Sequence, residues 1–92
     1  MTEQPTERKE LLQFPCDFPI KIMGRASDDF RAQAREIVER HAGSVPEDRV
    51  TERLSKDGNF LSVTYNIRAS SRPQLDDLYR ELSSHEQVLV VL

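Results

Sequence analysis

The sequence predicts an α+β domain of the ferredoxin-like βαββαβ class, with a four-stranded antiparallel sheet and two helices on one face. Two segments have the apolar spacing of helices, and four have the patterns of strands. Their order is strand, helix, strand, strand, helix, strand. Two right-handed strand–helix–strand units joined by a hairpin produce this sheet and leave its second face open.

The first predicted strand follows a proline-containing segment. Pro15 and Pro19 exclude a helix and favour extended backbone. Apolar Phe18, Ile20 and Ile22 then occupy every second position, which is the pattern of a half-buried strand. Gly24 is expected to end it.

Both predicted helices carry recognisable caps. Ser27 is the expected N-cap of the first, and Gly43 stands where the chain leaves it. Ser71 and Gln74 form a capping box at the start of the second. The apolar stripes are Phe30, Ala34, Ile37 and Val38 in the first helix and Leu75, Leu78, Tyr79 and Leu82 in the second.

The remaining strands differ in clarity. Residues 49–56 form a weaker strand, and Asp57-Gly58 is a strong hairpin signal. Residues 60–69 alternate over a long strand with one apolar face. The last strand, 88–92, is apolar at every position. Strict alternation would turn Val88, Val90 and Leu92 to one side and Leu89 and Val91 to the other.

Length and composition predict one domain. Residues 1–10 have the composition of a flexible tail, and residues 11–92 form the single ferredoxin-like domain. The net charge is −3, and no apolar run reaches the ~20 residues of a membrane helix. The N-terminus has no apolar signal segment, and the single Cys16 cannot form an internal disulfide. We therefore expect a cytoplasmic protein without membrane contact.

No residue pattern predicts catalysis, a metal site or a cofactor. A nucleophile–base pair would need Cys16 near a histidine, but His41 and His85 fall in separate helical regions. Zinc requires about four closely spaced ligands, which one cysteine and two distant histidines do not supply. The sequence therefore predicts a protein that is not an enzyme.

The open sheet face is the first candidate binding surface. The strand parities place Lys21, Arg49, Arg53 and Arg68 on it, together with Phe60. A basic face with a stacking aromatic residue keeps RNA binding as an alternative, although the RNA-recognition pattern would place more aromatic residues on this strand. Binding of RNA would then weaken steeply with salt.

Two further candidates are a turn and a strand edge. Gly24 and Arg25 begin the turn where a small effector would contact the backbone, because glycine permits close approach. Leu89 and Val91 would be exposed on an apolar edge strand, and such edges invite pairing with another chain. A protein partner or self-association is therefore expected.

Several segments resemble one known family. ELLQFPCDFPIKIMG, RHA at the end of the first helix, SKDGN, LYREL and the terminal VLVVL are similar to the YbeD family of small bacterial proteins, over residues 10–92. The resemblance implies a ferredoxin-like fold similar to ACT-type regulatory domains, which bind small effectors. It also implies a bacterial cytoplasmic protein with a link to lipoate metabolism. It supplies no catalytic or binding residues.

Overall fold

The computed structural model describes residues 12–92. The tail predicted for residues 1–10, and the first residue of the predicted domain, lie outside the described residues. The elements in chain order are β1 (Cys16–Arg25), α2 (Asp28–Ala42), a 3₁₀ turn η1 (Glu47–Arg49), β2 (Val50–Leu54), β3 (Phe60–Ala69), α3 (Arg72–Ser84) and β4 (Val88–Val91).

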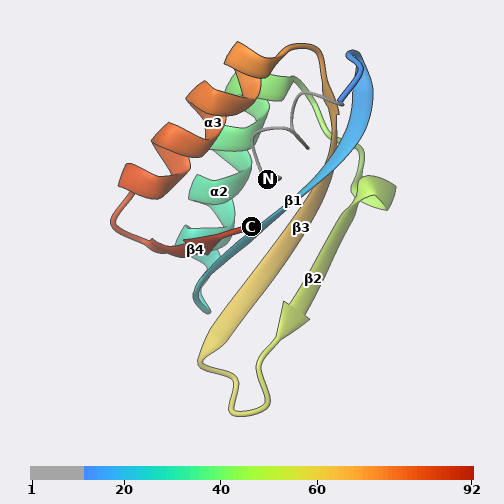
Figure 1. Ribbon diagram of the computed structural model, residues 1–92. Coiled ribbons are helices and arrows are strands. Elements are labelled where there is room, and N and C mark those ends of the chain that lie inside the picture. Colours follow the sequence, from blue (N-terminus) through green and yellow to red (C-terminus); the bar gives the residue numbers. More distant parts are fainter. Residues whose placement is uncertain (1–11) are drawn as a thin grey trace, which may run out of the picture.

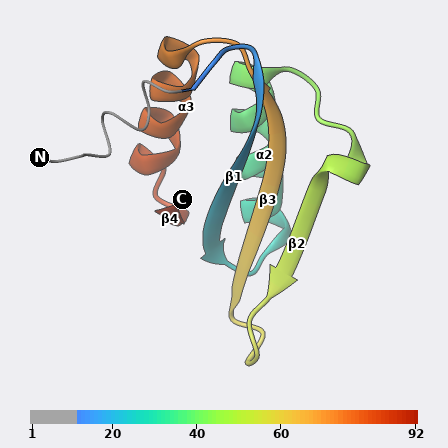
Figure 2. The same ribbon diagram turned by 45° about the vertical axis from the view of Figure 1, so that its right-hand side comes forward.

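The four strands form one antiparallel sheet in the order β2-β3-β1-β4. Both helices lie side by side on one face, and the other face has no covering element among the described residues (Figure 1). Figure 2 shows the β2–β3 hairpin reaching beyond the ends of the helices. The predicted ferredoxin-like fold is confirmed.

The core lies between the sheet and the helices. Strands β1 and β3 pair along their full length, so alternate residues of both turn to the helices. The largest fully buried side chains are Tyr65, Phe30, Ile20, Ile22, Ile37, Ile67, Leu78, Leu82, Val38 and Val63. Every one comes from a segment whose apolar spacing predicted a strand or a helix.

The predicted helix caps are present. Ser27 Oγ accepts a hydrogen bond of 2.9 Å from the Phe30 N–H at the start of α2. Ser71 Oγ accepts one of 3.2 Å from the Gln74 N–H at the start of α3. Gly43 has φ 81° and donates its N–H to the Glu39 carbonyl, which ends α2.

Strand β1 starts at Cys16, earlier than predicted, and includes Pro19. Lys21 exchanges two backbone hydrogen bonds with Leu92, of 3.1 and 2.8 Å, so its backbone groups point to the β4 side. By alternation the Pro19 nitrogen points to the same side, past the end of β4. The proline therefore removes no ladder bond, and the strand tolerates it.

Strand β2 is shorter than the predicted 49–56. Arg49 belongs to the 3₁₀ turn, and Ser55 to Asn59 form the connection to β3. The Asp57 carboxylate accepts hydrogen bonds from the Asn59 N–H (3.0 Å) and from Ser55 Oγ (2.7 Å), and these bonds lower the pKa of Asp57. These local side-chain bonds end the strand before the predicted boundary.

The predicted alternation of the last strand is wrong. Met23 pairs with Val90 while Gly24 pairs with Val88, so Leu89 is an extra residue in a bulge. Val88 and Val91 are partly buried against the core, whereas Leu89, Val90 and Leu92 are exposed. The bulge therefore turns the Val91 side chain to the helix side of the sheet and removes it from the expected exposed contacts.

Burial of Tyr65 predicts a loss of stability in alkali. Desolvation by burial, the largest cause, raises the pKa of Tyr65 to about 12, above the usual 10 of the unfolded chain. The buried, neutral phenol of Tyr65 contributes to the free energy of unfolding. This contribution is fully present below pH 10 and is lost as the pH rises towards 12. A shift of this size corresponds to roughly 2–3 kcal/mol.

Urea unfolding between pH 9 and 12 measures this effect, with Tyr65→Phe as the matched control. The variant lacks the phenol and is expected to lack this part of the pH dependence. Tyr65 ionising near pH 10 in the folded wild-type protein, seen by ultraviolet absorbance, would contradict the prediction.

Candidate functional site

The open sheet face carries rows of side chains fixed by strand register. Arg53 pairs with Ser62, and Ser62 pairs with Met23, so these three form one row across β2, β3 and β1. Arg25 pairs with Phe60 in the next row towards the hairpin. Because paired residues point to the same face, the predicted open-face positions of Arg53 and Phe60 are confirmed.

One end of this face is electrically compensated. The Asp17 carboxylate lies 3.3 Å from Arg68 Nη1 and 3.5 Å from Arg49 Nη1. All three side chains are largely exposed, so each pair contributes little to stability. Arg68 is therefore on the open face as predicted, but it faces a carboxylate of its own chain.

The hairpin end of the face is different. A shallow depression of about 660 Å³ lies there. It is lined by Lys21, Met23, Arg53, Leu54, Ser55, Lys56, Phe60 and Ser62. We call this set the hairpin patch. It holds three cations and no carboxylate, and Lys21 and Arg53 were both predicted for it.

Phe60 is not free to stack. The Arg25 guanidinium carbon lies 5.5 Å from the Phe60 ring centroid in a cation–π contact. Arg25 itself is exposed beside the hairpin patch. The predicted aromatic platform is therefore present, with its ring already in contact with an arginine.

The predicted effector contact at Gly24 does not agree with the structure. Gly24 is buried within β1, and a Cβ added there would lie 2.5 Å from the Gln87 carbonyl oxygen and 2.6 Å from Phe30 Cε1. The close approach that glycine permits is used by the chain's own α2 and the segment before β4. The Gly24 backbone is therefore buried, whereas Arg25 and Ser27 of the same turn line a hollow of about 240 Å³.

The exposed edge of β4 lies next to the hairpin patch. Leu89, Val90 and Leu92 are 55%, 41% and 65% exposed, and no side chain from Val88 to Leu92 is charged. The opposite edge strand, β2, carries Glu52 and Arg53 in its centre. The apolar edge predicted from the sequence is thus real, with Leu89 on it as expected.

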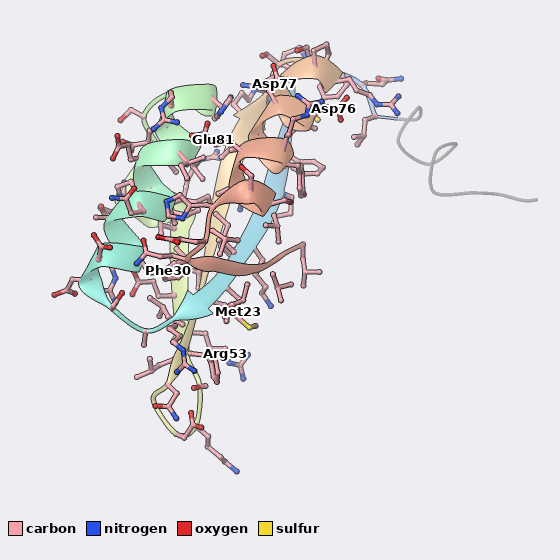
Figure 3. All side chains as sticks on the ribbon, turned by 90° about the vertical axis from the view of Figure 1, so that its left-hand side faces the viewer. Met23, Phe30, Arg53, Asp76, Asp77 and Glu81 are labelled. Carbon is pink, nitrogen blue, oxygen red and sulfur yellow. The ribbon has the colours of Figure 1, made fainter. Side chains whose placement is uncertain are left out.

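The helix side of the molecule has a different charge arrangement. Each arginine of α2 pairs with carboxylates: Arg31 with Asp28 and Glu52, Arg35 with Glu39 and Glu47, and Arg40 with Glu36 and Glu81. Hydrogen bonds from His41 and Arg40 lower the pKa of Glu81. Figure 3 shows Asp76, Asp77 and Glu81 on α3, away from Arg53 at the hairpin.

The reactive side chains belong to separate elements. Cys16 starts β1, His41 lies in α2 with Nε2 2.7 Å from Glu81 Oε1, and His85 ends α3. Within residues 12–92, no three histidine, cysteine or carboxylate side chains gather as metal ligands. None of the helices described is long and apolar enough to span a membrane.

Several residues of the exposed surface formed by the hairpin patch and the β4 edge were not singled out from the sequence, namely Met23, Leu54, Ser55, Lys56, Ser62, Val90 and Leu92. Lys56 and Leu54 join it because the hairpin extends past the helices, and Val90 and Leu92 because of the bulge in β4. The Asp57-Gly58 signal predicted the position of the hairpin in the sequence, but not that the hairpin extends past the ends of the helices. No period in VLVVL could reveal the bulge, because every position is apolar.

Comparison with known proteins identifies relatives. A family model described as "Protein of unknown function (DUF493)" matches residues 9–92. A UPF0250 protein of Janthinobacterium sp. is 49% identical over 96% of this chain and 94% of its own. Another from Neisseria gonorrhoeae is 40% identical over the full length of both chains.

A solved structure shares the fold. The solution structure of protein HP0495 from H. pylori superposes with a TM-score of 0.69, covering 100% of this chain and 98% of its own. Its sequence identity is 17%, so this likeness concerns the fold alone.

Proposed function

The chain belongs to the DUF493 family, the YbeD-like bacterial proteins of unknown function, and on that premise we propose that it is a non-enzymatic, ACT-like binding and regulatory module of the cytoplasm. It acts through the open sheet face and the β4 edge. Its first partner is a second copy of the same chain.

The uncharged β4 edge carries this proposal. Three neighbouring apolar side chains are exposed there, while β2 at the other edge carries charges that discourage pairing. Val91 directs its backbone N–H and C=O away from β1, because Leu92 directs its own to Lys21. A strand added at β4 would therefore find hydrogen-bonding groups and apolar surface together.

A second copy fits this edge because the edge is self-complementary. Antiparallel pairing of β4 with its equivalent about a two-fold axis opposes no like charges. The two open faces would then form one continuous surface. The strand is only four residues long, so we expect weak, concentration-dependent association.

Sedimentation velocity over a range of protein concentrations tests this association. Wild-type protein is expected to shift towards a dimer, while Val90→Lys stays monomeric to at least about tenfold higher concentration, because a lysine on an edge opposes pairing. Thr51→Lys places the same charge on β2 and should associate like wild type. A wild-type protein that remains strictly monomeric would reject self-association.

A small effector is a second ligand for the same module. The resemblance to ACT-type domains suggests amino acids, and the expected link to lipoate metabolism suggests lipoate-related metabolites. The hairpin patch has the size of small-molecule sites, about 300–1,000 Å³. A stabilising thermal shift with one of these compounds would support an effector, and a flat profile across the set would count against it.

RNA remains the alternative, and its supporting observation is the cationic hairpin patch. Its two requirements, phosphate contacts and a stacking platform, are met unequally. Three cations are available, but Arg25 already contacts the Phe60 ring and Arg68 already faces Asp17.

A further inference from the structure

The cations of the hairpin patch form no ion pair with a carboxylate side chain of the described residues. Within residues 12–92, Lys21, Arg53 and Lys56 take part in none of the ion pairs of 4.0 Å or less. The chain as a whole has more acidic than basic residues, 16 against 13. The lack of carboxylates in the patch reflects where they stand: seven belong to α2 and α3 on the other side of the sheet, Asp17 is with Arg49 and Arg68, and Asp57 accepts hydrogen bonds within the hairpin turn.

Apolar groups lie directly among these cations. Met23 and Leu54 line the same depression, and Met23 pairs with the exposed Val90 of β4. A ligand that covers the patch must therefore combine negative charge with apolar groups. This combination occurs in acidic protein segments, whereas single-stranded nucleic acid needs exposed aromatic rings on which its bases stack.

The state of Phe60, the only aromatic residue that lines the patch, favours an acidic protein segment over nucleic acid as the ligand. Phe60 is half-buried and contacts the Arg25 guanidinium, so a base would have to displace that contact. A carboxylate needs no such displacement, because it can approach the guanidinium edge or the lysine ammonium directly.

From these observations we infer that the hairpin patch binds an extended acidic segment of a partner protein, with carboxylates on Lys21 and Arg53 and an apolar side chain on Met23. The inference rests on the proposed function and names the chemistry of its ligand. Lys21 lies on β1 and Arg53 on β2, two strands away and two residues further along the strand direction. The usual spacings of a sheet then separate the two residues by about 12 Å. Glutamates four residues apart in an extended segment span a similar distance, with one residue between them on the same side.

The probe follows from that spacing. A synthetic peptide repeating Glu-Ser-Leu-Ser is titrated into ¹⁵N-labelled protein at low salt, and amide shifts are recorded. Shifts are expected at Lys21, Arg53 and Phe60, and they should decrease as salt rises. The same peptide with Gln for Glu tests whether charge is required, and a 12-nucleotide oligouridylate tests nucleic acid.

Paired variants locate the contact. Lys21→Thr/Arg53→Thr removes two charges from exposed strand positions and is expected to weaken peptide binding about fivefold or more. Arg72→Gln/Arg80→Gln removes two charges from α3 and should leave binding unchanged. Circular dichroism confirms that both double variants are folded.

The possible results separate the inference from the proposed function. Equal binding of the Gln peptide, equal loss in both double variants, or no shift with any probe overturns the inference. Oligouridylate shifting the patch without the acidic peptide overturns it in favour of RNA. Sedimentation of the same samples reports self-association independently: a dimer without peptide binding rejects only this inference, and a peptide-binding monomer rejects only the pairing of β4.

Discussion

Gly24→Ala is expected to lower the free energy of unfolding by about 2–3 kcal/mol, because the added methyl group overpacks a filled space. The new Cβ would meet the Gln87 backbone carbonyl oxygen and the buried ring of Phe30, both closer than 3 Å. Neither can move cheaply, since one is backbone and the other lies in the core. Thermal unfolding should show a decrease in Tm of roughly 10–20 °C.

Gly58→Asn is the matched control. Gly58 has φ 79°, and nothing lies within 4 Å of the position of its Cβ. Asparagine tolerates this left-handed backbone, so the substitution should cost less than about 1 kcal/mol. A Gly24→Ala protein as stable as this control would contradict the close packing of Gly24.

Phe30→Ala is expected to cost about 3–5 kcal/mol, because it removes a ring that is 1% exposed and leaves a cavity beside β1. Chemical denaturation measures the loss. A domain of this size has roughly 5–14 kcal/mol of stability, so the alanine variant could unfold completely. The milder Phe30→Leu removes less of the side chain and still gives a measurable unfolding transition.

Phe30→Leu also tests the contact with Gly24. In its background Gly24→Ala should cost about 1 kcal/mol less than in the wild type, because the leucine leaves room for the methyl group. Additive effects would assign the whole cost of Gly24→Ala to the Gln87 carbonyl.

The fold was predictable because its signals are local. Ser27, Gly43 and Ser71 bond to neighbours within a few residues, and β3 has an unbroken period of two. Once the order of elements is known, the handedness of strand–helix–strand units leaves few topologies. The two helices and the four strands follow from these facts.

The details of the site depend on non-local geometry. Asp17 meets Arg68 across 51 residues of chain, and no sequence pattern connects them. The side of the sheet to which Val91 points depends on the pairing register at Met23 and Gly24, and tertiary packing sets that register. Sequence reasoning therefore found the open face and the apolar edge, but misplaced the residues where strands shift or end.

The separation of charge across the sheet has a consequence for how this molecule behaves near charged surfaces. Its formal charge of −3 suggests repulsion from any anionic material. The cations at the hairpin end are nevertheless close together, and a surface samples the nearest charges within about a Debye length of 10 Å. At an ionic strength of about 0.1 M, where this screening length applies, the protein should be retarded on a cation exchanger as well as on an anion exchanger. It would approach the cation exchanger with its hairpin and the anion exchanger with its helices.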